Sequence, residues 1–259
     1  MSINSTEKTQ SSDEQMAMMA HLEELRTRLF WCVGTLVVTF GGALFLAPSL
    51  IRWMVSLTTW VSPTTSFHLV QITPGETLFA SLKLAMVVGA VGASPMVLYH
   101  TLRFVLPGLT QKERWPLIAI VLGGAVLFGV GAVFSAVVVI PTALAFLLEF
   151  ASGVAENWIS VDRYVGFCLS LILLVGLVAE FPLVLVFLAK LGWITSAQLA
   201  TRWREACLGL LLAGAVLTPS QDPLSMLLVA GLLGVLYMVS WVAIRLMEGA
   251  QSPKAVDSV

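Results

Sequence analysis

The chain has 259 residues, of which 58% are hydrophobic and only 11% are charged, and its formal net charge is −1 at pH 7. This composition leaves too little polar surface to cover a water-soluble globule, so lipid has to cover much of the chain. The small net charge also argues against nucleic acid as a partner, because nucleic-acid binding requires a concentrated basic surface. We therefore expect an integral membrane protein that does not bind nucleic acid.

Six runs without charged side chains follow one another, and each is a candidate membrane-spanning helix. The runs are Leu29–Ile51, Leu84–Leu102, Trp115–Leu148, Tyr164–Ala179, Ala206–Gln221 and Pro223–Ile244. They predict spans near 29–51, 77–102, 115–141, 164–189, 204–218 and 223–244. The fifth is short because Thr218-Pro219 ends it, so we expect it to lie against other helices rather than lipid alone.

The basic residues orient these spans. Eleven of the 14 Lys and Arg lie before the first run, between the second and third, between the fourth and fifth, or after the sixth. Because Lys and Arg near helix ends are retained on the cytoplasmic face, both termini are predicted to be cytoplasmic. The polar composition of 1–15 and 248–259 predicts disordered tails on either side of one membrane domain, 16–247.

Small residues and prolines shape the expected bundle. Glycine and alanine cluster at 89–93 and 123–131, where they allow helices to approach closely in lipid. Pro95, Pro141 and Pro182 should each kink or end a helix, because proline lacks a backbone donor and crowds the preceding turn. The fold class is therefore an all-α bundle of six transmembrane helices with a concave face.

The segment before the first run is amphipathic. Leucines 22 and 25 share one face at helical spacing, whereas Glu24 and Arg28 lie on another. One interpretation is an interfacial helix with a Glu24–Arg28 pair, worth about 0.3 kcal/mol. The other is that Glu24 acts together with Glu113, which follows the Pro107-Gly108 turn at the same predicted membrane surface. Two such carboxylates can accept two guanidinium groups bidentately, a geometry that lysine does not reproduce.

Further along the chain, Glu180 interrupts the fourth apolar segment. A charged side chain at a helix centre costs about 2.5–3.5 kcal/mol on insertion scales, so its carboxyl should face protein or water. Either a functional contact or a helix–helix hydrogen bond accounts for it. Asp222 precedes Pro223 and is expected to cap the sixth helix. The histidines and the three isolated cysteines lack ligand spacing, so neither a metal nor another cofactor is expected.

These features occur in the order typical of one family, and from Met18 to Met247 the chain resembles TatC, the core subunit of the twin-arginine protein translocase. The matching motifs are His21–Arg26, Ser94-Pro95, Phe104–Arg114, Glu180–Pro182, Leu217–Pro219 and Asp222-Pro223. Cyanobacterial and plastid members are the most similar, notably at Pro74–Glu76. His100 and Met226 depart from the family pattern, in which glutamine is usual.

The resemblance implies a glove-shaped receptor in the bacterial plasma membrane or the thylakoid membrane, without enzyme activity. It would bind twin-arginine signal peptides of folded cargo and, as a homo-oligomer with TatA- and TatB-type single-span partners, support transport driven by the proton gradient. The implied signal-peptide residues are Glu24, Arg26, Phe104, Pro107, Leu109, Glu113 and Arg114. The implied partner contacts are Glu180, Pro182 and Met226, and the structural turns are Pro95, Pro141 and Asp222.

Two other functions are compatible with the composition. An ion-coupled secondary transporter would use Glu180 as its proton site, although we find neither an internal repeat nor further intramembrane charges. An intramembrane hydrolase would need a Gly-x-Ser-x-Gly or Gly-x-Ser-Gly elbow, which the sequence lacks.

Overall fold

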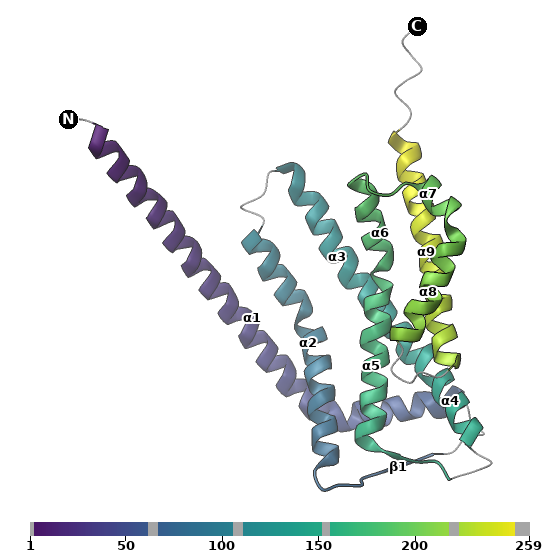
Figure 1. The fold of residues 1–259 in the computed structure, drawn as a ribbon. Helices are drawn as coiled ribbons and strands as arrows, with labels where there is room; N and C mark the ends of the chain where they lie inside the picture. The colour runs from purple at the N-terminus through teal and green to yellow at the C-terminus, as the bar shows by residue number, and fades with distance from the viewer. Residues whose placement is uncertain (1–2, 62–66, 106–110, 152–155, 218–222, 252–259) are drawn as a thin grey trace. The chain divides into compact units, whose positions relative to one another are not determined.

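The computed structural model describes residues 3–61, 67–105, 111–151, 156–217 and 223–251. Helices make up nearly all of this part of the chain (Figure 1), as predicted. The α-helices are α1 (Ile3–Val61), α2 (Glu76–Val105), α3 (Gln111–Phe134), α4 (Ile140–Ala151), α5 (Val161–Ala179), α6 (Phe181–Lys190), α7 (Ser196–Thr201), α8 (Trp203–Leu217) and α9 (Pro223–Gln251). A π-helical turn, η2 (Ser135–Val139), joins α3 to α4, and the strands β1 (His68–Val70) and β2 (Trp158–Ser160) complete the described elements.

Five helical segments of the described residues are long and apolar enough to cross a membrane. They are Leu22–Thr59, Glu76–Phe104, Leu117–Phe150, Val161–Lys190 and Pro223–Gly249. The predicted fifth span corresponds to α8, which has 15 residues and is therefore only about 22 Å long, against a hydrocarbon core of about 30 Å. Its predicted shortness is confirmed. It packs along α9, where a Cβ on Gly214 would lie 3.0 Å from the Met226 carbonyl oxygen.

The chain divides into two compact units. The first unit comprises Met1–Leu46 and Ala85–Val121, and the second comprises Ala47–Leu84 and Leu122–Val259. In the first unit α1 and α2 approach closely at Gly89, where an added Cβ would lie 2.8 Å from the Phe40 Cα. The Thr39 hydroxyl donates to the Gly89 carbonyl oxygen at 2.8 Å, so it satisfies a polar group at the point of contact.

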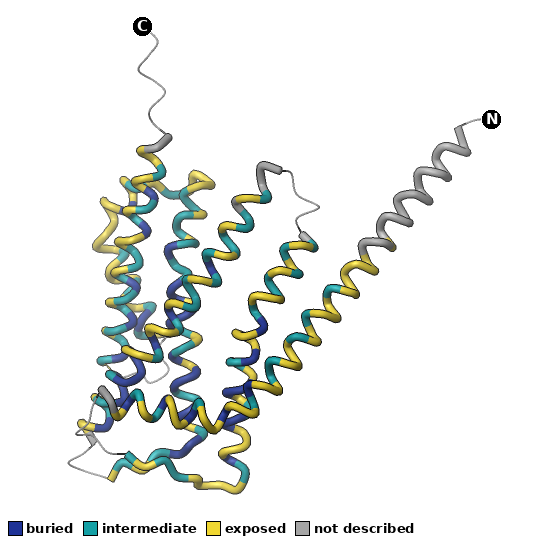
Figure 2. The backbone as a smooth tube through the Cα atoms, turned by 180° about the vertical axis from the view of Figure 1, so that it is seen from behind, coloured by how far each residue is buried: buried dark blue, intermediate teal, exposed yellow. Residues whose placement is uncertain are grey.

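The core of the second unit is centred on α5. Its residues Val165, Cys168, Leu171 and Val175 have no exposed surface (Figure 2). The α3 segment reaches α5 through Gly131, where a Cβ would lie 2.5 Å from the Ala179 Cβ. Close packing by small residues, which the sequence predicts, therefore operates between these two helices.

Prolines mark irregularities in two of the three predicted places. Pro182 lies in the first turn of α6, directly after the helix break at Glu180, where its missing N–H leaves no partner unsatisfied. Pro141 follows the π-helical turn and does not close the helix, which continues as α4 to Ala151. A wider turn before proline accommodates both the missing donor and the ring. Pro95 lies inside α2, which continues past it to Val105.

A small parallel sheet, which the sequence analysis does not predict, lies at one end of the second unit. β1 pairs with β2 in the register His68↔Trp158 to Val70↔Ser160. The buried Glu76 carboxylate accepts hydrogen bonds from the Ile72 and Asp162 backbone N–H groups, at 2.7 and 3.1 Å, and from the Ser160 hydroxyl. This carboxylate therefore ties the start of α2 to the start of α5.

Candidate functional site

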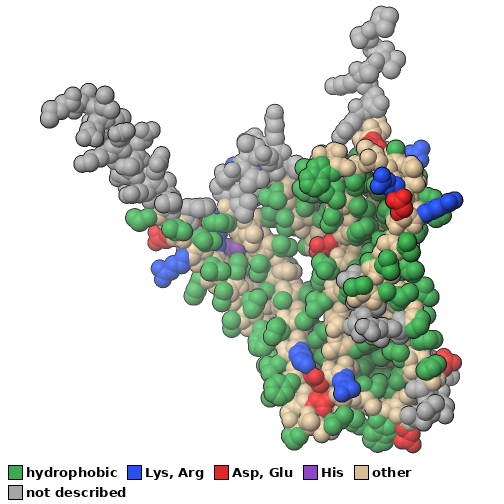
Figure 3. All heavy atoms as spheres, viewed as in Figure 1, with side chains coloured by type: hydrophobic (Ala, Val, Ile, Leu, Met, Phe, Trp, Pro, Cys, Tyr) green, Lys and Arg blue, Asp and Glu red, His purple; other side chains and the backbone are tan. Residues whose placement is uncertain are grey.

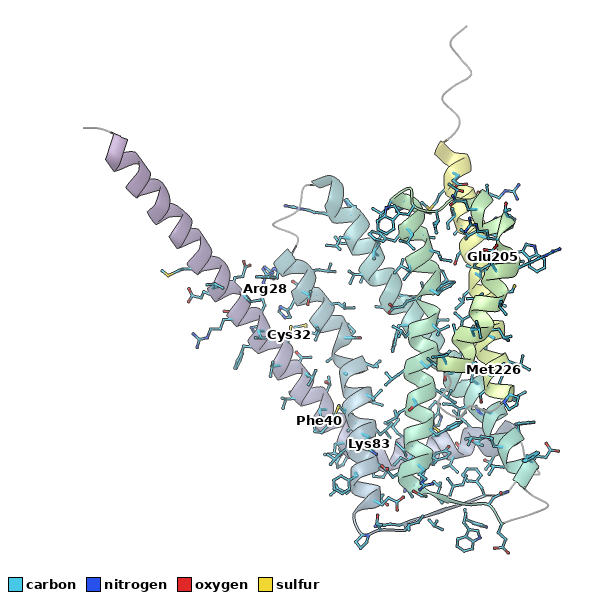
Figure 4. All side chains as sticks on the ribbon, viewed as in Figure 1. Arg28, Cys32, Phe40, Lys83, Glu205 and Met226 are labelled. Carbon is cyan, nitrogen blue, oxygen red and sulfur yellow. The ribbon has the colours of Figure 1, made fainter. Side chains whose placement is uncertain are left out.

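The candidate site in the first unit is built on the charged face of α1. The Arg28 guanidinium, labelled in Figure 4, lies over the Phe104 ring of α2, 5.8 Å from its centroid, and forms an ion pair with Glu24. The Arg28 side chain is 13% exposed, whereas that of Glu24 is 43% exposed. The charged face of α1 thus packs toward α2, while Leu22 and Leu25 of the leucine face are exposed.

This packing makes Glu24 an oriented, accessible carboxylate. Arg28 fixes it from one side, because a guanidinium is planar and can stack on an aromatic ring while it donates to a carboxylate. The predicted i,i+4 pair is therefore present, but it is part of a helix–helix contact rather than an isolated surface pair. The arrangement can accept a further cationic donor at the exposed side of the carboxylate.

Two buried nitrogen atoms nearby lack a partner among the described residues. They are the Arg28 Nη1 and the His100 Nε2 atoms. His100 precedes Phe104 by one helical turn, so both project from the same face of α2. The His100 ring also makes an edge contact with Tyr99, at 5.3 Å between centroids. The sequence analysis assigned Arg28 only to a surface pair with Glu24, whereas the structure also packs it on Phe104. Its spacing of four from Glu24 was the available signal.

The other predicted signal-peptide residues fall into three groups. Arg26 lies on a different face of α1 from Glu24 and lines a cavity of about 490 Å³ with neighbours of the same helix. Arg114 is half-buried near the start of α3, in the same unit as Glu24. The side chain of Glu113 lies outside the described residues, as do Pro107 and Leu109. The convergence of Glu24 and Glu113 therefore stays a prediction.

Glu180 lies in the second unit, at the break between α5 and α6. Its backbone N–H donates to the Leu177 carbonyl, and its own carbonyl oxygen accepts from Leu183. The half-buried carboxyl faces Gly124 of α3, where an added Cβ would lie 3.9 Å from Oε1. Glycine at this position leaves room beside the only acid of the predicted fourth span.

The remaining predicted contacts are distributed over other elements. Pro182 is buried in α6, and Met226 lies near the start of α9, where it contributes to the contact with α8 (Figure 4). Asp222 lies outside the described residues. All three cysteines are free; Cys168 is buried, Cys32 is half-buried and Cys207 is exposed. The described part of the chain contains no cluster of metal-ligating side chains.

Comparison with known proteins gives consistent matches. Residues 20–231 match the family described as Sec-independent protein translocase protein (TatC). The chain is 37% identical over 235 residues to the Sec-independent protein translocase protein TatC of Synechocystis, and the match covers 91% of this chain and 90% of that protein. It is 38% identical over 226 residues to the chloroplastic TATC of Oryza sativa, but spans only 62% of the rice protein's length.

A solved structure is similar over the same region. The crystal structure of a twin-arginine translocase receptor, TatC, superimposes with a TM-score of 0.66 at 33% sequence identity. The match covers 88% of this chain and 99% of that one. The fold and the sequence therefore agree on the same family.

Proposed function

The chain belongs to the Sec-independent protein translocase (TatC) family, and we propose that it is the subunit that binds the twin-arginine signal peptides of folded cargo. The family makes it a non-enzymatic, multi-pass membrane protein of the twin-arginine translocation pathway. This membership favours translocation over the ion-coupled transporter that Glu180 alone permits.

The observation that carries the proposal is the orientation of Glu24 by Arg28 and Phe104. An arginine of the signal peptide can share or replace the contact that Arg28 makes with this carboxylate. Each charge-assisted hydrogen bond contributes about 1.5–3 kcal/mol, so two arginines on two carboxylates provide both affinity and specificity. Glu113 is proposed as the second acceptor. Arg114, Phe104, Pro107 and Leu109 would shape the surface around the acids, and Arg26 would contribute positive charge at its edge.

Photocrosslinking of a signal peptide with a photoreactive residue beside its arginine pair tests this proposal. The full chain is inserted in membrane vesicles with its partners. Glu24→Gln together with Glu113→Gln should abolish the crosslink, because neutral amides remove both anionic acceptors. Glu23→Gln removes one negative charge from the residue next to Glu24 and should leave the crosslink intact. Undiminished crosslinking by the double variant would refute the assignment.

A six-span topology with both termini cytoplasmic is proposed from the charge distribution and supported by contacts in the second unit. Glu76 and Ser160 hydrogen-bond to each other, so α2 and α5 begin on one side. At the other end of α5–α6, the Ser196 backbone N–H donates to Glu248 at 3.0 Å, and Glu248 lies near the end of α9. This contact supports a hairpin of α8 and α9 that returns the chain to the side that it left.

Glu180, with Pro182 and Met226, is proposed as the contact for TatA- and TatB-type single-span partners, and several copies of the chain would share one receptor complex. The space that Gly124 leaves beside the half-buried carboxyl supports a polar contact with a partner helix. In the vesicle experiment, a photoreactive residue at position 180 should crosslink a single-span partner. Crosslinking that involves lipid alone would contradict this part of the proposal.

A further inference from the structure

A second cavity lies at the end of the second unit where α6, α7, α8 and α9 meet. It has a volume of about 460 Å³, which is within the range of small-molecule sites. Its lining residues are Leu185, Trp193, Ile194, Gln198, Leu199, Arg202, Glu205, Ala206 and Tyr237. None of them belongs to the proposed signal-peptide or partner contacts, so the signal-peptide proposal leaves this cavity unexplained.

The wall of the cavity formed by α7 is fixed by hydrogen bonds to α9. The Tyr237 hydroxyl donates to the Leu199 carbonyl at 2.8 Å, and the Trp241 indole N–H donates to the Ser196 carbonyl at 3.1 Å. At its start, α7 also has a capping box between Thr195 and Gln198. These hydrogen bonds fix the position of the six-residue helix α7 against α9, so this wall of the cavity is part of the folded structure.

The surroundings of the cavity are those of a membrane surface. Four basic residues, Lys190, Arg202, Arg204 and Arg245, and two acids, Glu205 and Glu248, belong to the helices and turns around this cavity. Figure 3 shows basic and acidic side chains together at one end of this unit. Two of the arginines stack on interfacial tryptophans, Arg204 on Trp203 at 5.6 Å and Arg245 on Trp241 at 5.3 Å. Tryptophan and basic residues together mark the level of lipid headgroups, and basic pockets between membrane helices bind them.

Two exposed charged side chains of the lining define the ligand more closely. The exposed Glu205 carboxylate, labelled in Figure 4, has no hydrogen-bond or ion-pair partner in the part of the chain that the structure describes, and the same holds for the exposed Arg202 guanidinium. A guanidinium binds phosphate oxygens, and a carboxylate accepts from an ammonium or a hydroxyl group. The apolar residue Leu185 lies in the candidate span Val161–Lys190, so the lining of the cavity includes part of a segment that is apolar enough to cross a membrane.

We propose that this cavity binds the headgroup of a membrane phospholipid, with the phosphodiester on Arg202 and the donor end of the headgroup, an ammonium or a hydroxyl, on Glu205. A lipid satisfies both unpartnered charges at once and places its acyl chains along α6. Free phosphate matches only Arg202 and has no group for Glu205 or for the apolar wall. The bound lipid would hold α8, which is too short to span the bilayer alone, against α6 and α9.

Native mass spectrometry of the full chain in mild detergent tests the proposal. Phosphatidylglycerol, phosphatidylethanolamine and phosphatidylcholine are added in separate arms, with inorganic phosphate as a competitor. The first two should bind more tightly than phosphatidylcholine, which has no donor for Glu205, and Glu205→Gln should reduce this preference. Millimolar inorganic phosphate should not displace the lipid.

Arg204→Gln is the matched control for Arg202→Gln, because both remove one arginine from the same segment but only Arg202 lines the cavity. Arg202→Gln should weaken phospholipid binding on the order of tenfold, the loss expected for one charge-assisted hydrogen bond, and Arg204→Gln should not. Equal losses in the two variants, displacement by phosphate, or no retained lipid in the unaltered chain would each overturn the proposal. These measurements of lipid binding do not depend on signal-peptide crosslinking. The lipid proposal and the signal-peptide proposal can therefore be refuted independently.

Discussion

At the scale of single residues, Arg28 does more than neutralise Glu24. Its guanidinium is mostly buried between the carboxylate and the Phe104 ring, so it holds α1 to α2 as well. A long basic side chain in such a position stabilises by packing in addition to charge. The residue that orients the acid is therefore also part of the contact between the two helices.

Replacing Arg28 should accordingly change stability and not only recognition. Arg28→Gln is expected to destabilise the contact between α1 and α2 by about 1–2 kcal/mol, from the stacking and the ion pair together. Arg28→Lys keeps the charge but loses the planar stack, so its effect should be intermediate. The measurement is the denaturant dependence of Cys32 labelling, since Cys32 lies half-buried one turn along α1.

Arg26→Gln provides the comparison for this prediction. Arg26 lies on another face of the same helix, so its loss should change labelling by less than about 0.5 kcal/mol. If the two glutamine variants behaved alike, the contact between Arg28 and Phe104 would have no part in stability.

At the scale of elements, glycine positions decide how closely helices approach. A Cβ at Gly131 would lie 2.5 Å from the Ala179 Cβ and 2.7 Å from the Val175 carbonyl oxygen, so α3 and α5 would have to separate. Gly131→Ala is therefore expected to lower the thermal unfolding temperature in detergent by several degrees. Gly129→Ala has no atom within 4 Å of the added Cβ and should instead be neutral. A neutral Gly131→Ala would show that α3 does not approach α5 so closely.

The same pair of glycines shows what the sequence can and cannot predict. Clustered small residues predict close packing somewhere along the third apolar run, but they do not identify which glycine faces the neighbour, because that depends on how α3 is rotated. The break at Glu180-Pro182 is predictable, since proline acts locally. The pairing of β1 with β2 is not predictable, because it joins short segments separated by two apolar runs.

The candidate site likewise has features that the sequence predicts and features that it does not. The sequence identifies Glu24 by its motif and places Arg28 four residues later, where a helix brings the two together. It does not show that Phe104 lies beneath Arg28, because that contact depends on the register of α1 against α2. Side-chain pairs within one helix can therefore be predicted from the sequence, whereas contacts between helices can be identified only from the structure.

At the scale of the whole molecule, the orientation of the termini depends on α8. Five helical segments of the described residues are long and apolar enough to cross a membrane, and five crossings would place the two termini on opposite sides. The hydrogen bonds of Ser196 to Glu248 nevertheless bring the end of α9 back to the segment that precedes α8. The proposed six-span topology therefore counts the short α8, together with its connection to α9, as the remaining crossing.

Accessibility labelling decides this point. In a chain without its native cysteines, a cysteine at Ala197 and a cysteine at Glu248 are predicted to react with an impermeant maleimide from the same, cytoplasmic side. Thr73→Cys, in the turn before α2, should react only from the opposite side, because in the proposed topology α5 and α6 together cross once between the Glu76–Ser160 contact and α7. Labelling of positions 197 and 248 from different sides would contradict both the six-span topology and the structure of the second unit. Labelling of all three positions from one side would show that α5 and α6 do not cross the membrane.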